Sequence, residues 1–252
     1  MTAQPASRVV ARLKEHESGR QQILFFPFVP EAATERAIEG HIASARTEFG
    51  GDIKLLRIRL SAEQTAVRAQ LKAMGFVVDG YEFGVAPLVI RSWHRDTGLP
   101  QELAVRRLDY DADIDAPTAM EKAIHAADPS SRVSFEDEQA RRSMQRHYKR
   151  ASETGSVFVM VQSEQLVGVL GFMTDKTRDK ALHVSTAGIA TQLQGRGLFM
   201  PFLATALEQL DLGDTDLVTW VTTTDRLLGL LARRGVSPLG CSLIREDALQ
   251  PS

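Results

Sequence analysis

The sequence contains few of the features that cross-link a protein or anchor it in a membrane. Its 252 residues include one cysteine, Cys241, which excludes an internal disulfide or a cysteine cage for zinc and is typical of a reducing compartment. The longest apolar run, residues 23–29, is interrupted by Pro27 and is too short to span a bilayer. The first residues also lack the apolar core of a signal peptide. These absences predict a cytoplasmic protein with no membrane partner.

An excess of charge of one sign is also missing. The chain carries 30 Lys and Arg residues against 32 Asp and Glu residues, a formal net charge of −2, so no global basic field favours nucleic acid as a partner. Apolar residues make up 43% and charged residues 25%, which is typical of a globular protein and excludes a disordered chain. The length allows one large domain or two compact ones.

Predicted strands and helices alternate on both sides of a polar segment, residues 92–102, which is predicted to be a linker. Before it, strands are predicted at 23–29, 54–60 and 85–90, and helices at 31–49 and 62–74. After it, strands are predicted at 103–108, 156–162, 166–174, 182–190, 217–222 and 239–244, and helices at 117–126, 134–151, 198–210 and 225–234. This order predicts an α/β fold in which helices cover a sheet.

A weak internal repeat supports two related halves. Leu71 to Gly75 and Leu231 to Gly235 each end a predicted helix and lead into a predicted strand. Glycine is favoured at such a helix end because it adopts left-handed backbone geometry easily. Junctions of this kind are common in α/β proteins, so an accidental similarity stays open.

The most informative segment is the glycine-rich stretch over residues 188–199, between a predicted strand and a predicted helix. Gly195 and Gly197 let the backbone turn sharply and approach a ligand, and the unpaired N–H groups of the first helical turn then face an anion. Arg196 can add a charge-assisted contact. The stretch is neither a Walker A loop nor a dinucleotide fingerprint, and a plain strand-to-helix turn is the alternative.

The run Gln194-Gly195-Arg196-Gly197, in this context, resembles the acyl-CoA-binding segment of the GNAT superfamily of N-acetyltransferases. The order of elements over residues 103–246 is also similar to that fold. The resemblance implies acetyl-CoA as a co-substrate, with its pyrophosphate on the amides of residues 194–199 and its pantetheine arm along residues 188–190. The implied binding residues are Gly188, Ile189, Ala190, Gln194, Gly195, Arg196, Gly197, Leu198, Phe199 and Thr224.

Three positions depart from the family pattern. Phe199 stands where the loop usually ends in a small residue, and Thr224 stands where an asparagine is frequent. Leu231 occupies the place of the tyrosine that often serves as general acid, and an aliphatic side chain cannot donate a proton. Either another group or water then protonates the leaving thiolate, or the domain does not catalyse.

The two halves together resemble a truncated GNAT-like unit over residues 1–95, followed by a complete acyl-CoA-binding unit over residues 101–252. This arrangement is similar to the dTDP-fucosamine acetyltransferase family, on the segment 71–82, Arg132 and the pair His147-Tyr148. The resemblance implies a nucleotide-linked amino sugar as the acceptor. Other amines stay open, among them amino acids, polyamines, antibiotics and protein amines.

His183 is the candidate catalytic base. It lies on the strand that leads into the loop, where period-two alternation places His183, Ser185, Ala187 and Ile189 on one face. An imidazole has an ordinary pKa of about 6.5, which suits proton transfer near neutral pH. A half-exposed histidine without a catalytic role is the alternative. The basic residues around His147 form either a solvated helix face or an attractor for an anionic acceptor.

The sequence therefore predicts an N-acyltransferase with an α/β, GNAT-like mixed sheet flanked by helices. It would move an acetyl or other acyl group from acyl-CoA to the primary amine of a small molecule, without a metal ion, and a homodimer is left open. The alternative is a non-catalytic acyl-CoA-binding or scaffold protein with a degenerate fold, because Leu231 and Phe199 depart from the family pattern.

Overall fold

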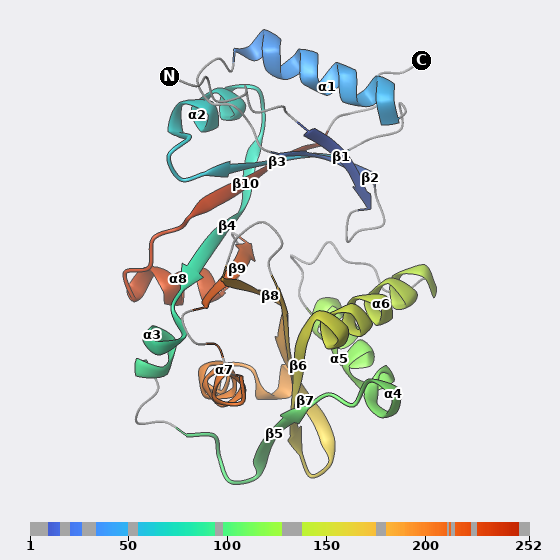
Figure 1. Ribbon diagram of the computed structural model, residues 1–252, viewed down its shortest axis with the longest axis vertical. Helices are drawn as coiled ribbons and strands as arrows, with labels where there is room; N and C mark the ends of the chain where they lie inside the picture. Colours follow the sequence, from blue (N-terminus) through green and yellow to red (C-terminus); the bar gives the residue numbers. More distant parts are fainter. Residues whose placement is uncertain are drawn as a thin grey trace. The chain divides into compact units, whose positions relative to one another are not determined.

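The computed structural model divides the chain into two compact units (Figure 1). The residues it describes are 10–15, 21–26, 34–49, 55–93, 98–127, 138–174, 180–210, 212, 215–222 and 226–246. The first unit comprises Met1–Phe83 together with Trp220–Ser252, and the second is Gly84–Thr219. The C-terminal segment thus groups with the N-terminal residues.

The sheet of the first unit takes its central strand from the end of the chain. Its strands follow the order β1 (Val10–Glu15), β2 (Gln21–Phe26), β3 (Leu55–Ser61), β10 (Gly240–Glu246) and β4 (Val77–Val85). β10 lies between β3 and β4 and is antiparallel to both, whereas β2 and β3 are parallel. The first unit therefore needs residues from both ends of the sequence to complete its hydrogen-bonded sheet.

Two helices cover one face of this sheet, α1 (Glu35–Phe49) and α2 (Thr65–Ala73). The apolar residues of each helix recur at a spacing of three or four, and those of β3 alternate. The apolar side chains of the helices and the strand therefore pack into one core. The core contains Ile38, Ile42, Ala45, Leu56, Ile58, Leu60, Val67, Leu71, Phe76, Cys241 and Leu243. Burial raises the pKa of the Cys241 thiol, which lies in this core as a free cysteine.

The two helix ends expected to be similar have the same hydrogen bonds. The N–H groups of Gly75 and Phe76 donate to the carbonyls of Lys72 and Leu71. At the end of α8 (Arg226–Arg233), the N–H groups of Gly235 and Val236 donate to Ala232 and Leu231 in the same way. Gly75 has a φ of +85° and Gly235 a φ of +71°. Both are Schellman motifs, which confirms the predicted left-handed glycines.

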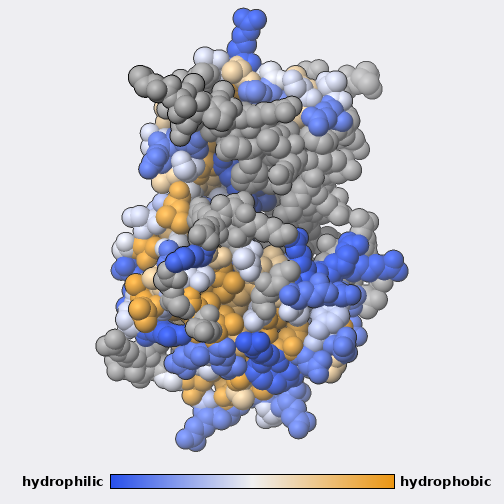
Figure 2. Space-filling view, in the orientation of Figure 1, coloured by the Kyte–Doolittle hydropathy of each residue, from blue (hydrophilic) through white to orange (hydrophobic). Residues whose placement is uncertain are grey.

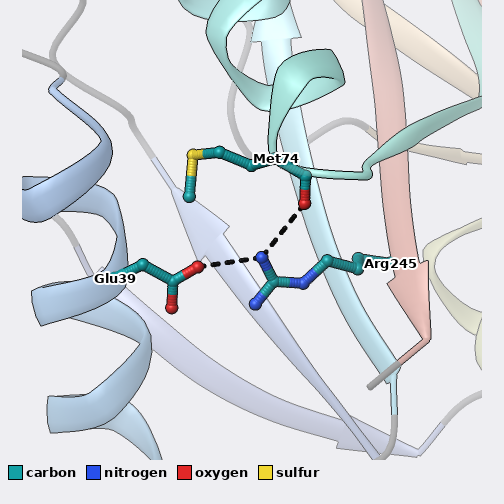
Figure 3. A network of polar contacts seen from close by, with 3 residues as sticks. All are labelled: Glu39, Met74 and Arg245. Carbon is teal, nitrogen blue, oxygen red and sulfur yellow. Dashed lines mark hydrogen bonds and ion pairs between the residues drawn. The ribbon is translucent and has the colours of Figure 1, made fainter. Parts of the chain in front are cut away.

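Arg245 of β10 connects the helices of the first unit (Figure 3). Its Nη1 atom lies 2.9 Å from Glu39 Oε1 on α1 and donates to the Met74 carbonyl, 3.3 Å away at the end of α2. Its guanidinium carbon lies 4.8 Å from the centre of the Phe76 ring. A cation at a helix C-terminus is favoured by the partial negative charge of the last carbonyls. One side chain of the last strand thus holds α1 and α2 together.

The second unit is a mixed sheet with helices on both faces. Its strand order is β9 (Asp216–Thr222), β8 (Ala181–Ile189), β7 (Gln165–Thr174), β6 (Gly155–Gln162) and β5 (Leu103–Arg107). Neighbours from β5 to β8 are antiparallel, and β8 is parallel to β9. The β6–β7 turn places Ser163 and Glu164 at φ values of 47° and 67°, which confirms the predicted tight hairpin.

Helices α5 (Asp115–Ala127) and α6 (Glu138–Thr154) lie on one face of this sheet, with α4 (Tyr110–Asp113) before them. Helix α7 (Phe199–Glu208) covers the opposite face (Figure 1). Two glycines of the sheet show how closely α7 and α5 approach its two faces. A Cβ at Gly168 would meet the Phe202 ring of α7 at 3.1 Å, and one at Gly188 would meet Ile124 Cδ1 of α5 at 2.9 Å.

The predicted strand over residues 85–90 is wrong. Val85 ends β4, a strand the sequence analysis missed together with β1, and the apolar run after it is the helix α3 (Pro87–Ser92). Pro87 fits a first helical turn, where its missing N–H has no cost, and Arg91 Nη2 donates to the Leu207 carbonyl of α7 at 2.8 Å. Figure 2 shows hydrophobic residues exposed where Figure 1 places α3.

The other predicted elements are confirmed within a few residues at their ends wherever the structure describes them. The parts of these predictions at residues 27–29, 31–33, 54, 94–97, 134–137 and 225, and also Arg132, lie outside the described residues. Among the helices that the structure describes, none is both long and apolar enough to cross a bilayer.

We expect Gly240 to be essential for the pairing of β10. A Cβ at this position would collide with the Leu60 carbonyl oxygen of β3, so Gly240→Ala should lower the free energy of unfolding by about 2 kcal/mol. Gly40→Ala is the control, because Gly40 is exposed in α1 with open space around it, and this change should raise stability by about 0.5–1 kcal/mol. Urea unfolding measures both. Equal stability of Gly240→Ala and the wild type would contradict the insertion of β10 between β3 and β4.

Candidate functional site

The glycine-rich loop lies between β8 and α7, where the sequence placed it. It follows a short 3-10 helix, Thr191–Leu193, and its two glycines have φ values of +77° for Gly195 and +75° for Gly197. Leu193 and Leu198 are buried at either end, and the residues between them are exposed. Gln194 Nε2 donates to the Ile189 carbonyl at 3.0 Å and ties the loop to the end of β8. The loop is therefore an exposed backbone segment held at both ends.

The backbone of this loop presents a row of N–H groups. Leu198 is the N-cap of α7 without a side-chain cap, and none of the N–H groups of residues 195–200 donates to a described residue. A Cβ at Gly195 or Gly197 would meet nothing within 4 Å, so the space beside both glycines is open. The positive end of the α7 dipole adds to these donors. Such a helix start can hold a phosphate group.

One edge of β8, the strand before the loop, is paired with another described strand only near its start. β8 pairs with β9 only from Ala181 to His183, whereas its pairing with β7 continues to Ile189. From Val184 onward, the edge that faces β9 has no ladder partner among the described residues. An unpaired strand edge can bind an extended ligand through its N–H and C=O groups.

A β-bulge begins where that edge becomes available. Val184 lies opposite Phe172 and Thr186 lies opposite Gly171, so Ser185 is an extra residue in β8. His183, Ser185, Thr186 and Gly188 consequently share the face covered by α5. The expectation that Ala187 and Ile189 belong to this face is wrong, because the extra residue reverses the alternation after it.

The same face of β8 contains a buried polar cluster. Thr186 Oγ1 donates to Glu121 Oε1 of α5, and Glu121 is only 5% exposed. Tyr148 of α6 is fully buried, and its hydroxyl lies beside Glu121. Burial first, and then the Glu121 carboxylate, raise the pKa of Tyr148 well above its ordinary value of 10.0. The Ser185 hydroxyl is also buried without a hydrogen bond.

Sequence reasoning missed Glu121 and Thr186. The signal for Glu121 was its position on the apolar stripe of α5, four residues after Pro117 and three before Ile124, where a charged residue is unexpected. Thr186 gave no comparable signal, because its orientation depends on the bulge.

The remaining predicted residues have different surroundings. His183 is half-buried on β8, and Thr224 lies outside the described residues. Leu231 is buried in α8. On α6, Arg142, Arg146, Lys149 and Arg150 are exposed, as a solvated face requires.

An apolar pocket of about 330 Å³ lies next to the loop in the second unit. It is lined by Ala116, Ala119, Met120, Ala123, Leu166, Ala190, Thr191 and Gln192. The α5 residues leave room because three of the four are alanines.

The mixed sheet, the helices on its faces and the loop at the start of α7 define a GNAT-like α/β fold, which confirms the predicted fold class. No family model and no curated protein matches the sequence. Solved structures do match. A functionally unknown conserved protein from Staphylococcus epidermidis has a TM-score of 0.63 at 13% identity, over 98% of this chain and 94% of that one.

Two further matches have names that state a function. A GCN5-related N-acetyltransferase from Kribbella flavida has a TM-score of 0.60 at 16% identity, over 90% of this chain and 81% of that one. A GCN5-related glucosamine N-acetyltransferase region of a fungal multi-domain β-N-acetylglucosaminidase has a TM-score of 0.61 at 12% identity, over 94% of this chain and 31% of that one. At sequence identities this low, the matches show that the fold is shared and nothing more.

The raised pKa of Tyr148 predicts a loss of stability in alkali. The unfolded chain loses this phenol proton at about pH 10, before the folded protein does, so the contribution is complete below that pH and falls above it by about 1.4 kcal/mol per pH unit. Tyr148→Phe should remove this part of the slope, and Tyr81→Phe, at a half-buried tyrosine of the first unit, should keep it. Urea unfolding between neutral pH and pH 11 measures the difference. Identical slopes for the wild type and Tyr148→Phe would contradict the assignment.

Proposed function

We propose that this chain binds acyl-CoA and transfers its acyl group to a primary amine. The observation that carries the proposal is the exposed loop at the start of α7, whose N–H groups over residues 195–200 are unsatisfied among the described residues. The free edge of β8 continues directly into this loop. The fold similarity to GCN5-related N-acetyltransferases supports acyl transfer as the general reaction.

The residues of the loop fit a pyrophosphate. The left-handed glycines expose the backbone, and the space beside them is open. Arg196 is exposed within the loop and can add a positive charge. Phe199 is half-buried in the first turn of α7, and its amide belongs to the same row of donors. In this proposal the polar edge of β8 from Val184 to Ile189 takes the amide groups of the pantetheine arm.

The transfer requires a neutral amine. Its nitrogen attacks the thioester carbonyl carbon, the carbon–sulfur bond breaks, and the amine loses a proton to a base. His183 is the proposed base, because it is half-buried on the α5 face of β8, one residue before the available edge begins. Leu231 offers no acid, so water or another group meets the thiolate.

The acceptor is proposed to be an amino sugar linked to a nucleotide. The exposed cations of α6 would attract its phosphates, and the glucosamine N-acetyltransferase among the matching structures has an amino sugar in its name. The same proposal includes a truncated GNAT-like unit over residues 1–95 and a complete GNAT-like unit over residues 101–252. It also places the protein in the cytoplasm and includes a homodimer.

A second candidate function is non-catalytic binding of acyl-CoA. It is favoured by Leu231, which is 4% exposed and replaces the usual acid with an apolar side chain. Acetyl-CoA that binds without release of free thiol on any amine acceptor would support this candidate.

Gly197→Glu should weaken the binding of acetyl-CoA by at least about tenfold, because it adds a negative charge and a side chain at a φ of +75°. Gly98→Glu is the matched control. Gly98 is exposed and a Cβ there would meet nothing within 4 Å, so the affinity of this variant should stay within about twofold of the wild type. Calorimetric titration measures both. Unchanged affinity of Gly197→Glu would reject the loop as the phosphate site.

His183→Ala should lower kcat by about 100-fold and leave the Kd for acetyl-CoA unchanged, because general bases contribute at least this much. His41→Ala, at an exposed histidine of α1, should change neither quantity. Release of free thiol with an amine acceptor gives kcat, and calorimetry gives Kd. A variant with wild-type kcat would remove His183 from the mechanism.

A further inference from the structure

The β8 bulge lies at the point where the strand stops pairing with β9. His183 is the last residue of β8 in register with β9, and the extra residue Ser185 follows two positions later. A bulge bends and twists its strand locally. The direction of the free β8 edge beyond His183 therefore depends on the geometry of Ser185 and Thr186.

Two features of the surroundings bear on that geometry. Gly171 of β7 lies opposite the bulge and leaves room for it, because a Cβ there would be only 2.8 Å from both Ser185 Oγ and Thr186 Cγ2. From the helix side, Glu121 of α5 accepts the hydrogen bond of the Thr186 hydroxyl. The bulge thus lies opposite a glycine on the neighbouring strand and is held by a hydrogen bond to a carboxylate on the covering helix.

Burial of a carboxylate at this position lowers the stability of the folded protein. Glu121 is 5% exposed, and the buried hydroxyl of Ser185 in the bulge has no hydrogen-bond partner among the described residues. A buried charge and unsatisfied hydroxyls each cost stability, and apolar residues of similar size often replace such groups without loss. Stability alone therefore does not account for a glutamate here.

We infer that Glu121 is a positioning residue, which fixes the Ser185–Thr186 bulge through Thr186 and so directs the free edge of β8 toward the acyl-pantetheine chain. The inference rests on the proposed acyl-CoA function. It assigns Glu121 a role in cofactor geometry without contact to the reacting atoms, which agrees with its burial.

The test compares two threonine changes that each remove a part-buried hydroxyl. Thr186→Val loses the hydrogen bond to Glu121, and acetyl-CoA should bind about tenfold more weakly. Thr118→Val is the matched control. Thr118 lies on α5, the helix that contains Glu121, but its hydroxyl donates to the Ile114 carbonyl at the start of that helix. The affinity of this variant for acetyl-CoA should stay within about twofold of the wild type. Thr186→Ser keeps the hydroxyl and should restore wild-type affinity.

Glu121 is tested by the same titration. Glu121→Gln keeps an acceptor oxygen for Thr186 and should bind within about threefold of the wild type. Glu121→Leu should match Thr186→Val, and the double variant should be no weaker than either single variant, because both changes remove one interaction. Each titration is done on protein whose folding is verified by circular dichroism. Amide hydrogen exchange of residues 184–189 should be faster in Thr186→Val than in Thr118→Val.

The outcomes separate the two proposals. A wild-type protein that binds no acetyl-CoA overturns the proposed function and, with it, the purpose assigned to the bulge. A wild type that binds, together with a folded Thr186→Val that binds equally well, overturns the positioning role alone. Weak binding by Thr186→Val with recovery in Thr186→Ser supports it.

Discussion

The pairing of β10 between β3 and β4 is the constraint on which the first unit depends. This strand forms an antiparallel ladder with each neighbour, places Cys241 and Leu243 in the core, and uses Arg245 to join two helices. Its partners are more than 150 residues away in the chain. Contacts this distant in sequence carry a loop-closure entropy cost and are associated with slow folding. The first unit therefore becomes complete only when the C-terminal strand has been added.

In the second unit, one strand organises the candidate site. β8 pairs with β9 at its start, contains the bulge in its middle and ends at the glycine-rich loop. These features differ physically: a ladder stabilises the strand, a bulge bends it, and the loop after it has N–H groups without an acceptor among the described residues. The polar residues around the bulge are buried at a cost that the surrounding apolar packing offsets. The site is thus built into the sheet, and its loop lies at the surface.

The predictability of this fold varied with the physical origin of each feature. The amphipathic helices and alternating strands were predicted well, because their periodicity is visible in a single segment. Residues 85–90 were assigned wrongly, since a short apolar run does not distinguish a strand from a helix, and contact between α3 and α7 decides the matter. The loop was found through Gly195 and Gly197, whose left-handed backbone has few alternatives to glycine. Glu121 and Thr186 were not found, because one extra residue in β8 determines which side chains face α5.

Local sequence was enough to define the α/β class, the alternation of elements, the two glycine-ended helices and the left-handed glycines of the loop. Each of these follows from local chemistry: the period of apolar residues and the backbone freedom of glycine. Long-range packing, by contrast, set the partnership of β10 with the N-terminal strands, the bulge in β8 and the meeting of Glu121 with Thr186. These depend on hydrogen-bond partners from distant segments, and no single stretch of sequence contains both partners.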